Sequence, residues 1–225
     1  MAGETIKVAV DTVALAVEQG ALEVLLVKRK FEPYKSLWAL PGGSLEETDQ
    51  TLDQAAAREL LEETNVGDVY LEQLYTFGDK GRDPRGRTVT ASYLALLRQE
   101  GLELKAGSKA RGVAWWKVNE LPELAFDHAS IISYARQRVK YKLEYSPAAF
   151  MLLPEKFTLR DLQSVYEAVL GKAVDNRNFR KKFLNTGVLQ ELNETSQEGS
   201  FRPARLYTFS LEEFEKLPDR PVFMF

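Results

Sequence analysis

The sequence predicts an α+β protein in which a larger domain, built on a mixed β-sheet, is followed by a small helical domain. β-branched residues gather in short segments separated by turn residues over the first half of the chain, which is typical of strands. One capped helix interrupts these segments, and two amphipathic helices followed by two short strands occupy the last third. A chain of 225 residues is long enough for two modest domains.

The composition excludes several classes of protein. With 44% hydrophobic and 28% charged residues, the chain is globular rather than disordered. A net charge of −3 leaves nucleic-acid binding to a local basic patch, and the lack of cysteine excludes disulfides, thiolate metal ligands and a cysteine nucleophile. No segment approaches the roughly 20 apolar residues that cross a membrane, and charged residues interrupt the apolar runs near the N-terminus. We therefore expect a cytoplasmic protein of bacterial type with no membrane partner.

The strands of the first domain are predicted in order along the chain. Residues 6–17 and 21–30 form two strands around the turn Glu18-Gln19-Gly20. Four further strands are predicted at residues 37–40, 69–77, 87–97 and 113–116. Residues 128–143 have the apolar periodicity of a helix with a basic outer face. These segments together predict a mixed sheet with helices on its faces.

One predicted helix carries the main chemical signal. It begins at the capping box Thr51-Leu52-Asp53-Gln54, and the alanines at residues 55–57 let it lie close to a neighbour. Its C-terminal end carries Glu59, Glu62 and Glu63, whose i, i+3, i+4 spacing brings three carboxylates onto one side. Unpaired carboxylates at this spacing repel each other, which favours a cation among them. A solvated, glutamate-rich helix end is the alternative interpretation.

The residues before this helix favour a cation among the glutamates over a solvated helix end. An extended segment ends at Gly42 and Gly43, and the capped helix with its carboxylates follows. This order resembles the Nudix box, in which a glycine-rich loop precedes the pattern R-E-U-x-E-E, where U is apolar. Gly43 matches the first glycine of the box, and six later residues match its helix: Arg58, Glu59, Leu60, Glu62, Glu63 and Val66. The resemblance implies an α/β/α sandwich around the mixed sheet.

The chain departs from the Nudix box in its loop and at its end. One additional residue lengthens the loop between the first glycine and the arginine, and Gln50 stands where the box has a glutamate. Glu46 or Glu47 in the lengthened loop is a candidate to replace that carboxylate. Asn65 replaces the closing glycine, and asparagine tolerates the left-handed conformation of a helix C-cap.

The resemblance assigns a metal ion to the three glutamates. Mg²⁺ prefers a few carboxylates together with substrate phosphate oxygens. Mg²⁺ or Mn²⁺ held by Glu59, Glu62 and Glu63 would neutralise a diphosphate and lower the pKa of a bound water. Arg58 is expected to orient these glutamates through charge-assisted hydrogen bonds. These four residues are the predicted catalytic group.

Other candidate residues lie in the glycine-rich segment, the long polar loop and the later elements. Five residues are predicted to contact the ligand: Gly42, Gly43, Arg82, Arg85 and Arg87. Solvation of the three arginines is the alternative, and Asp79 or Asp83 is a candidate accessory ligand or base. His128 is expected to cap or hydrogen-bond locally rather than to catalyse. Trp115 and Trp116 either stack an adenine or divide between core and surface.

The character of the chain changes around Tyr145-Ser146-Pro147, which predicts a first domain at residues 1–145 and a second at residues 146–225. Thr158 and Asp175 are the predicted N-caps of two helices in the second domain. The elements expected there are helices at residues 161–170 and 176–185 and strands at residues 188–192 and 206–209. Helix, turn, helix, strand, loop and strand in this order are typical of a winged helix-turn-helix.

The second of these helices is basic on one face. Phe179 and Phe183 lie on one side, which is therefore expected to face the core. Four residues on the other side are predicted to contact DNA: Arg177, Asn178, Arg180 and Lys181. Arg202 and Arg205 add positive charge where a wing would meet the DNA backbone. A solvated basic helix on an ordinary helical domain is the alternative.

Three further motifs extend the resemblance over nearly the whole chain: Arg82-Asp83-Pro84-Arg85-Gly86, Phe126-Asp127-His128 and Arg177-Asn178-Phe179-Arg180-Lys181-Lys182. With them the chain is similar to the Nudix-related transcriptional regulators of NAD and sugar metabolism. The resemblance implies a homodimer that binds operator DNA and releases it when ADP-ribose, or a related nucleoside-diphosphate sugar, enters the Nudix pocket. The intact Arg58, Glu59, Glu62 and Glu63 favour Mg-dependent hydrolysis retained alongside regulation. Two alternatives stay open: a Nudix hydrolase that cuts ADP-ribose into AMP and ribose 5-phosphate, and a C-terminal module that only dimerises the enzyme.

Overall fold

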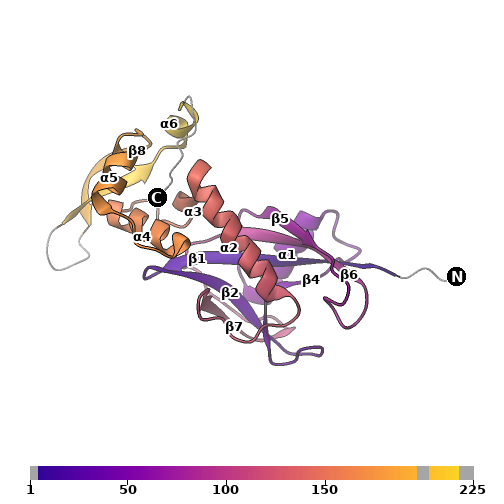
Figure 1. The fold of residues 1–225 in the computed structure, drawn as a ribbon. Coiled ribbons are helices and arrows are strands. Elements are labelled where there is room, and N and C mark those ends of the chain that lie inside the picture. The colour runs from indigo at the N-terminus through magenta and orange to yellow at the C-terminus, as the bar shows by residue number, and fades with distance from the viewer. Residues whose placement is uncertain (1–4, 197–202, 218–225) are drawn as a thin grey trace. The chain divides into compact units, whose positions relative to one another are not determined.

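The computed structural model describes residues 5–196 and 203–217, and Figure 1 labels its elements. The chain forms two compact units. The first comprises the residues up to Ala16 together with Glu23–Arg136, and the second comprises Val17–Leu22 together with the residues from Gln137 onward. None of the described helices is long and apolar enough to cross a membrane.

A mixed sheet forms the centre of the first unit, as the sequence predicts. β1 (Lys7–Glu18) pairs in parallel with β6 (Thr88–Leu96) and antiparallel with β4 (Gly42–Ser44). The strand order is β3-β2-β1-β6-β5, with β7 paired to β2. The remaining strands of this sheet in the described residues are β2 (Ala21–Arg29), β3 (Trp38–Ala39), β5 (Glu72–Phe77) and β7 (Ala110–Lys117).

Strand β4 has no counterpart among the elements predicted from sequence. Gly42 and Gly43 were expected to end an extended segment, whereas they pair with Asp11 and Val10 of β1 as part of the sheet. Glycine is disfavoured in strands because it offers no side chain to pack, so its local sequence signal is that of a turn. Pairing with a central strand overrides that preference.

Helix α1 (Leu52–Thr64) lies close to the sheet because its inner face is built from small residues. Ala55 and Ala56 are fully buried and pack with Val10, Ala91 and Tyr93 of β1 and β6. The close approach that the alanine run predicts is therefore present. It brings the C-terminal half of α1, with its glutamates, onto the sheet.

The ends of α1 are set by local hydrogen bonds. Thr51 is the N-cap, and its hydroxyl oxygen accepts a hydrogen bond from the backbone N–H of Gln54 at 3.1 Å. The Gln54 side chain accepts in turn from the backbone N–H of Gln50 at 2.9 Å, one residue earlier than in a standard capping box. Asn65 ends the helix in the left-handed conformation with a φ of 65°, as predicted for this position.

Helix α2 (His128–Tyr145) leads into the second unit, which has the element order of a winged helix-turn-helix. The remaining described elements are α3 (Ala148–Met151), α4 (Leu159–Leu170), α5 (Asn176–Leu184), β8 (Leu189–Ser196), β9 (Ala204–Phe209) and α6 (Leu211–Glu215). β8 and β9 pair antiparallel. The sequence prediction lacks α3 and α6, because helices of four and five residues are too short to show a periodicity.

Aromatic side chains hold the two helices of this unit together. Tyr166 of α4 packs edge-on against Phe179 and Phe183 of α5, with ring centroids 5.4 and 5.3 Å apart. All three side chains are buried, and the Tyr166 hydroxyl donates a hydrogen bond to the Leu143 carbonyl at 3.1 Å. The inward face of α5 is therefore the one that the sequence predicts, and its opposite face is left exposed.

Helix α4 begins at a complete capping box. The backbone N–H of Asp161 donates to the Thr158 hydroxyl oxygen at 3.2 Å, and the backbone N–H of Thr158 donates to the Asp161 carboxylate at 2.8 Å. Gly171 ends the helix in the left-handed conformation with a φ of 71°. These contacts fix the length of the helix that α5 packs against.

Replacing Thr158 by alanine removes this N-cap, and we expect the free energy of unfolding to fall by about 1 kcal/mol. Urea denaturation followed by circular dichroism measures the change. Thr158→Ser is the matched control, because serine caps at least as well as threonine. An equal loss in both variants would show that the lost contact is the packing of the threonine methyl group and not the cap.

Candidate functional site

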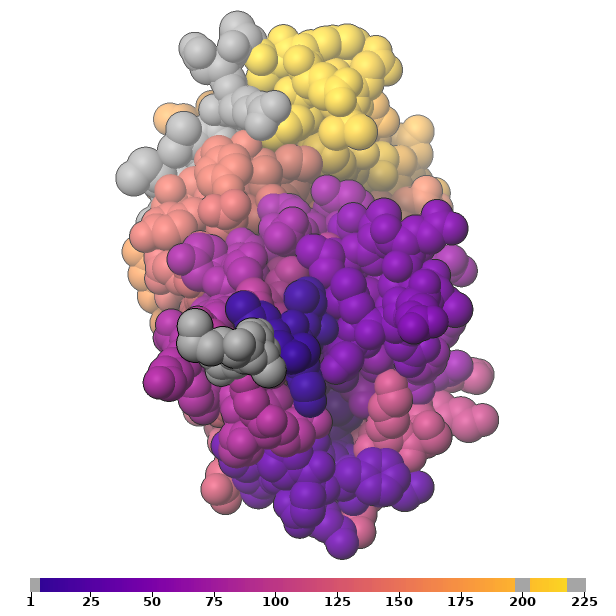
Figure 2. All heavy atoms as spheres, turned by 90° about the vertical axis from the view of Figure 1, so that its right-hand side faces the viewer, coloured from indigo at the N-terminus to yellow at the C-terminus, as the bar shows by residue number. Residues whose placement is uncertain are grey.

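The first unit contains a cavity of about 350 Å³ that is lined by residues of strands β1, β2 and β4 and of helix α1. Its wall includes the first residues of β1, and Figure 2 shows the start of this strand, in indigo, at the surface. Six basic side chains line the cavity: Lys7, Arg29, Lys30, Arg82, Arg85 and Lys109. Six acidic side chains also line it: Asp11, Glu32, Glu46, Glu59, Glu63 and Asp83. A cavity with this lining suits a ligand that carries charge.

The three glutamates of α1 differ in their exposure. Glu59 and Glu63 are buried, with 1% and 7% of their surface exposed, and both line the cavity. The side chain of Glu62 is 48% exposed and is not part of the cavity wall. The helical spacing brings the three residues onto one side, but the sheet covers only two of them.

Gly42 and Gly43 allow the sheet to approach these glutamates. A Cβ atom on Gly43 would lie 2.3 Å from a carboxylate oxygen of Glu59, so any other residue here would displace that side chain. The backbone N–H of Gly42 donates to the Glu63 carboxylate at 3.0 Å. Both glycines line the cavity, where the sequence places ligand contacts.

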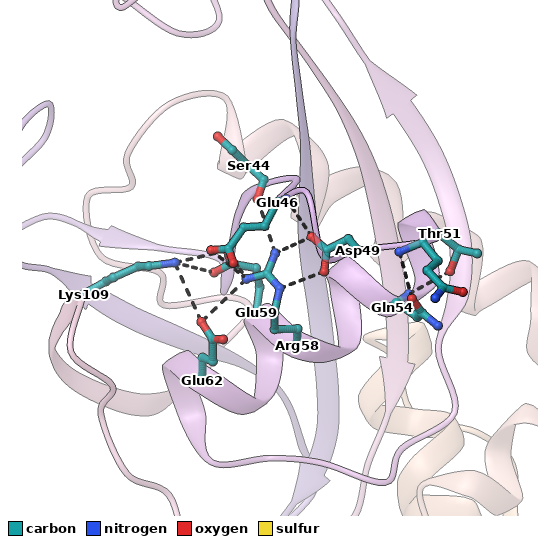
Figure 3. Close-up of polar contacts among 10 residues, drawn as sticks. Ser44, Glu46, Asp49, Thr51, Gln54, Arg58, Glu59, Glu62 and Lys109 are labelled. Atoms are coloured by element: carbon teal, nitrogen blue, oxygen red, sulfur yellow. Dashed lines mark hydrogen bonds and ion pairs between the residues drawn. The ribbon is translucent and has the colours of Figure 1, made fainter.

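Arg58 holds the carboxylates of this region in place and does not line the cavity. Its guanidinium donates to both oxygens of Asp49, at 2.9 and 2.7 Å, and to Glu59 at 2.9 Å (Figure 3). The paired guanidinium lowers the pKa of Asp49 to about 2. Glu46 lies 3.5 Å from the same arginine. The charge-assisted contacts give Arg58 the geometry of a residue that orients Glu59.

Asp49 was not predicted as a site residue. For the glutamate position of the Nudix box, the sequence offered Gln50 at that position and Glu46 or Glu47 as a replacement. The lengthened loop shifts the side chains by one position, so that an aspartate precedes the glutamine and reaches Arg58. The signal in the sequence was an acidic residue next to Gln50, the position at which the Nudix box has a glutamate. The missing carboxylate of the Nudix box is thereby replaced.

Lys109 is a second residue that the sequence analysis missed. Its ammonium nitrogen lies 3.2 and 3.3 Å from the two carboxylate oxygens of Glu59 and 3.9 Å from Glu62 (Figure 3). Burial opposes the charge of Lys109, but the neighbouring carboxylates outweigh it and raise its pKa above the ordinary value. The lysine therefore remains positively charged at neutral pH. No local signal marks it, since 50 residues separate it from Glu59.

The arrangement of these donors does not fit a divalent metal ion. In residues 5–196 and 203–217, no group of three histidine, aspartate or glutamate side chains is placed to hold one. Arg58 and Lys109 both bond the Glu59 carboxylate, and the Gly42 amide bonds Glu63. Both oxygens of Glu59 and one oxygen of Glu63 are thus already bonded to groups of the protein, whereas Glu62 is half exposed and lies 3.6 Å from Arg58 and 3.9 Å from Lys109.

Two of the three loop arginines reach the cavity. Arg82 is buried and pairs with Asp127 at 2.7 Å and with Asp11 at 3.3 Å, so the alternative of a solvated side chain does not hold for this residue. Arg85 pairs with Asp83 at 2.6 Å, and its own side chain is 52% exposed. Arg87 does not line the cavity, although its carbonyl accepts a hydrogen bond at 2.9 Å from the backbone N–H of Lys7, which does.

The sequence predicts a local hydrogen-bonding role for His128, but the partner of its side chain lies 88 residues away along the chain, and His128 lines the cavity. It is buried at the start of α2, and its Nδ1 accepts a hydrogen bond from the Leu40 backbone N–H at 2.8 Å. Burial lowers its pKa, so the ring is neutral at neutral pH. Trp115 and Trp116 are both half-buried, and Trp116 packs edge-on against Trp38 with ring centroids 5.3 Å apart. Neither tryptophan lines the cavity.

The candidate DNA-binding residues lie on the exposed face of α5. Arg177, Asn178, Arg180 and Lys181 are all exposed. Within the described residues, neither Arg177 nor Arg180 nor Lys181 forms a salt bridge. Arg205 lies in β9 and pairs with Glu191 of β8. Arg202 lies outside the residues that the structure describes.

The two units define a class of protein. Residues 5–135 match the Nudix domain family, and residues 149–209 match the NrtR DNA-binding winged helix domain. The chain is therefore a Nudix domain followed by a winged helix domain of the NrtR DNA-binding type.

Comparison with individual proteins narrows the class to one family. The chain is 37% identical over 209 residues to the ADPR responsive transcriptional repressor NtrR of Acinetobacter baylyi, covering 92% of this chain and 83% of that protein. Shewanella oneidensis NrtR in complex with a 27mer DNA is similar in structure, with a TM-score of 0.78 and 37% identity over 90% of this chain and 93% of that one. The NUDIX domain of the Shewanella protein in complex with ADP ribose aligns with a TM-score of 0.57 and 38% identity, over 61% and 91% of the two chains. The chain belongs to the NrtR family of Nudix-related transcriptional regulators, which confirms the resemblance found in the sequence.

The pKa of Glu63 couples the stability of the protein to pH. Burial raises this pKa from 4.5 to about 7, although the Gly42 amide and the charges of Lys109 and Arg29 act against the shift. The native state therefore binds the proton more tightly than the unfolded chain, and this carboxyl lowers stability as pH rises from about 4.5 to about 7.

We expect Glu63→Gln to remove this dependence. Relative to the wild type, the variant gains up to about 3 kcal/mol in free energy of unfolding between about pH 4 and about pH 8. Urea denaturation at several pH values, in the presence of EDTA, measures the gain. Glu62→Gln on the same helix is the control for an exposed carboxylate. A Glu63→Gln difference that stays constant across the range would contradict the raised pKa.

Proposed function

We propose that this chain is a transcriptional repressor that binds operator DNA through its winged helix and releases the DNA when ADP-ribose occupies the cavity of its Nudix domain. The observation that carries the proposal is the presence, in one chain of the NrtR family, of a charged cavity and of a free basic helix face. The Shewanella NrtR structure in complex with DNA aligns with 90% of this chain. The NUDIX domain of that protein in complex with ADP ribose aligns with 61% of this chain. A cytoplasmic location follows from contact with the chromosome.

The cavity has the properties that a nucleoside-diphosphate sugar requires. A volume of about 350 Å³ falls at the lower end of ligand pockets, so part of a ligand of this size would extend toward solvent. Gly42 and Gly43 of strand β4 form part of the cavity wall. The side chain of Arg85 is about half exposed and offers a guanidinium to phosphate or ribose. Arg82 is bonded to two aspartates and is proposed to shape the wall. Arg87 remains a weaker candidate because it lies outside the lining.

The exposed face of α5 has the properties of a major-groove reader. Arg177, Arg180 and Lys181 would contact phosphates or guanine edges, and Asn178 is suited to adenine. Arg205 is held in the β8–β9 hairpin by Glu191, where a wing approaches the backbone. We propose that the protein acts as a homodimer, because a two-fold dimer of such units reads two half-sites about 34 Å apart.

Reversing two charges on α5 tests the DNA interface. We expect the double variant Arg180→Glu with Lys181→Glu to lose about two orders of magnitude in operator affinity and to flatten the salt dependence, since two phosphate contacts become repulsive. Gel-shift titrations at several salt concentrations, on promoter fragments of NAD and sugar metabolism genes, measure both. Arg111→Glu with Lys117→Glu on exposed positions of β7 is the matched control.

The same assay distinguishes the proposal from a C-terminal module that only dimerises the protein. In that case, neither double variant would change DNA binding. Adding ADP-ribose to the wild-type complex tests the effector separately, because we expect the shifted band to disappear as the cavity fills. A complex that persists at saturating ADP-ribose would exclude this effector and leave DNA binding standing.

A second candidate function is hydrolysis of ADP-ribose to AMP and ribose 5-phosphate. The intact series Arg58, Glu59, Glu62 and Glu63 favours it, and Nudix hydrolases typically use a divalent metal ion such as Mg²⁺ or Mn²⁺. In that function the three glutamates would be metal ligands and catalytic residues. The repressor is favoured because cations of the protein already pair with Glu59.

We expect ADP-ribose to remain intact when it is incubated with the protein and Mg²⁺, because a carboxylate bonded to two cations is a poor metal ligand. Chromatographic separation of ADP-ribose from AMP measures turnover. AMP formation that is lost in Glu59→Gln and Glu63→Gln would establish the hydrolase instead. AMP formation that persists in both variants would come from a contaminating enzyme.

A further inference from the structure

We infer that the ammonium group of Lys109 takes the place of a divalent cation beside Glu59 and Glu62, so that the cavity binds its diphosphate ligand without a metal ion. The inference rests on the proposed function, since it concerns how the same cavity holds its ligand.

The position of the ammonium group is that of a cation shared by two carboxylates. Lys109 Nζ contacts both oxygens of Glu59, at 3.2 and 3.3 Å, and lies 3.9 Å from Glu62. The guanidinium of Arg58 bonds one of the Glu59 oxygens at 2.9 Å (Figure 3). With 1% exposure, Glu59 is a buried carboxylate that needs compensating charge, and these two groups supply it.

The loop that carries Lys109 is built against the end of α1. The backbone N–H of Gly107 donates to the Glu63 carbonyl at 3.2 Å, and that of Lys105 donates to the Thr64 carbonyl at 3.0 Å. A Cβ atom on Gly107 would lie 1.9 Å from the Glu62 carbonyl oxygen, so only glycine permits this approach. The close contact between loop and helix brings the lysine within reach of the carboxylates.

The backbone beside Lys109 is held from the other side as well. The Lys109 carbonyl accepts a hydrogen bond from the backbone N–H of Lys30 at 3.2 Å, and the Lys30 side chain donates to the Ser108 carbonyl at 3.2 Å. Strand β7 starts at the next residue, Ala110. The ammonium therefore extends from an anchored backbone and not from a free loop.

A lysine and a metal ion differ in what they do to a bound diphosphate. Both offset its negative charge, but an ammonium neither polarises phosphorus as a metal does nor lowers the pKa of a coordinated water. Arg58 has the place of the arginine that orients the glutamates of a Nudix box, so the additional cation is Lys109, and a metal ion that approached Glu59 would meet its repulsion and would have to displace it. A cavity with this built-in cation binds a diphosphate and leaves it uncut.

Mn²⁺ binding to the full-length protein, in the absence of nucleotide, tests the inference directly. Electron paramagnetic resonance of free Mn²⁺ measures the affinity of the wild type, of Lys109→Met and of two controls. Lys105→Met removes an exposed lysine from the same loop outside the cavity, and Lys109→Arg keeps the charge. We expect Lys109→Met to bind Mn²⁺ about ten-fold or more tightly than the wild type, because the repulsion is removed, and both controls to resemble the wild type.

Mn²⁺ binding by the wild type that equals that of Lys109→Met would overturn the inference. A second measurement uses the wild type alone: calorimetric titration with ADP-ribose in EDTA and in Mg²⁺ is expected to yield the same affinity within about two-fold, since the ligand needs no metal. Binding that occurs only with Mg²⁺ would also overturn it. If ADP-ribose binds in neither buffer, the proposed function fails, and the Mn²⁺ comparison still decides the role of Lys109.

Discussion

The carboxylate of Glu59 lies inside the protein with 1% of its surface exposed, bonded to Arg58 and Lys109. Removing a negative charge from water is costly unless cations and hydrogen bonds replace the solvent. Gly43 leaves room for the carboxylate, Asp49 holds Arg58 in position and the loop of residues 105–109 brings Lys109. These groups around α1 together compensate this one buried charge.

The same compensation explains how a Nudix motif can serve recognition. In a metal-dependent site, carboxylates are kept available for an ion that the substrate helps to bind. Here Glu59 is neutralised by the chain itself, and Glu63 is buried with a pKa of about 7, which reduces its negative charge. The negative charge available to a metal decreases, while Arg85 of the lining keeps about half of its side chain exposed.

The second unit presents positive charge on a short helix, α5. The nine residues of α5 include four arginines and lysines, and a helix of this length is marginal in isolation. Two phenylalanines, both fully buried, attach it to Tyr166 of α4. Arg177, Arg180 and Lys181 lie on the face of α5 opposite these phenylalanines, and all three are exposed.

The sequence by itself determined the elements whose signals are local. Caps at Thr51, Thr158 and Asp175 and the phenylalanine pair of α5 were predictable because each depends on residues within one helical turn. Only the tertiary structure decided that Lys109 reaches Glu59, that Asp49 pairs with Arg58 and that Arg82 is buried between Asp127 and Asp11. The lysine and Arg82 contacts join residues 45 to 71 positions apart, and the Asp49 contact depends on the path of a lengthened loop. Sheet pairing and loop packing create such contacts, and the spacing of residues along the chain does not record them.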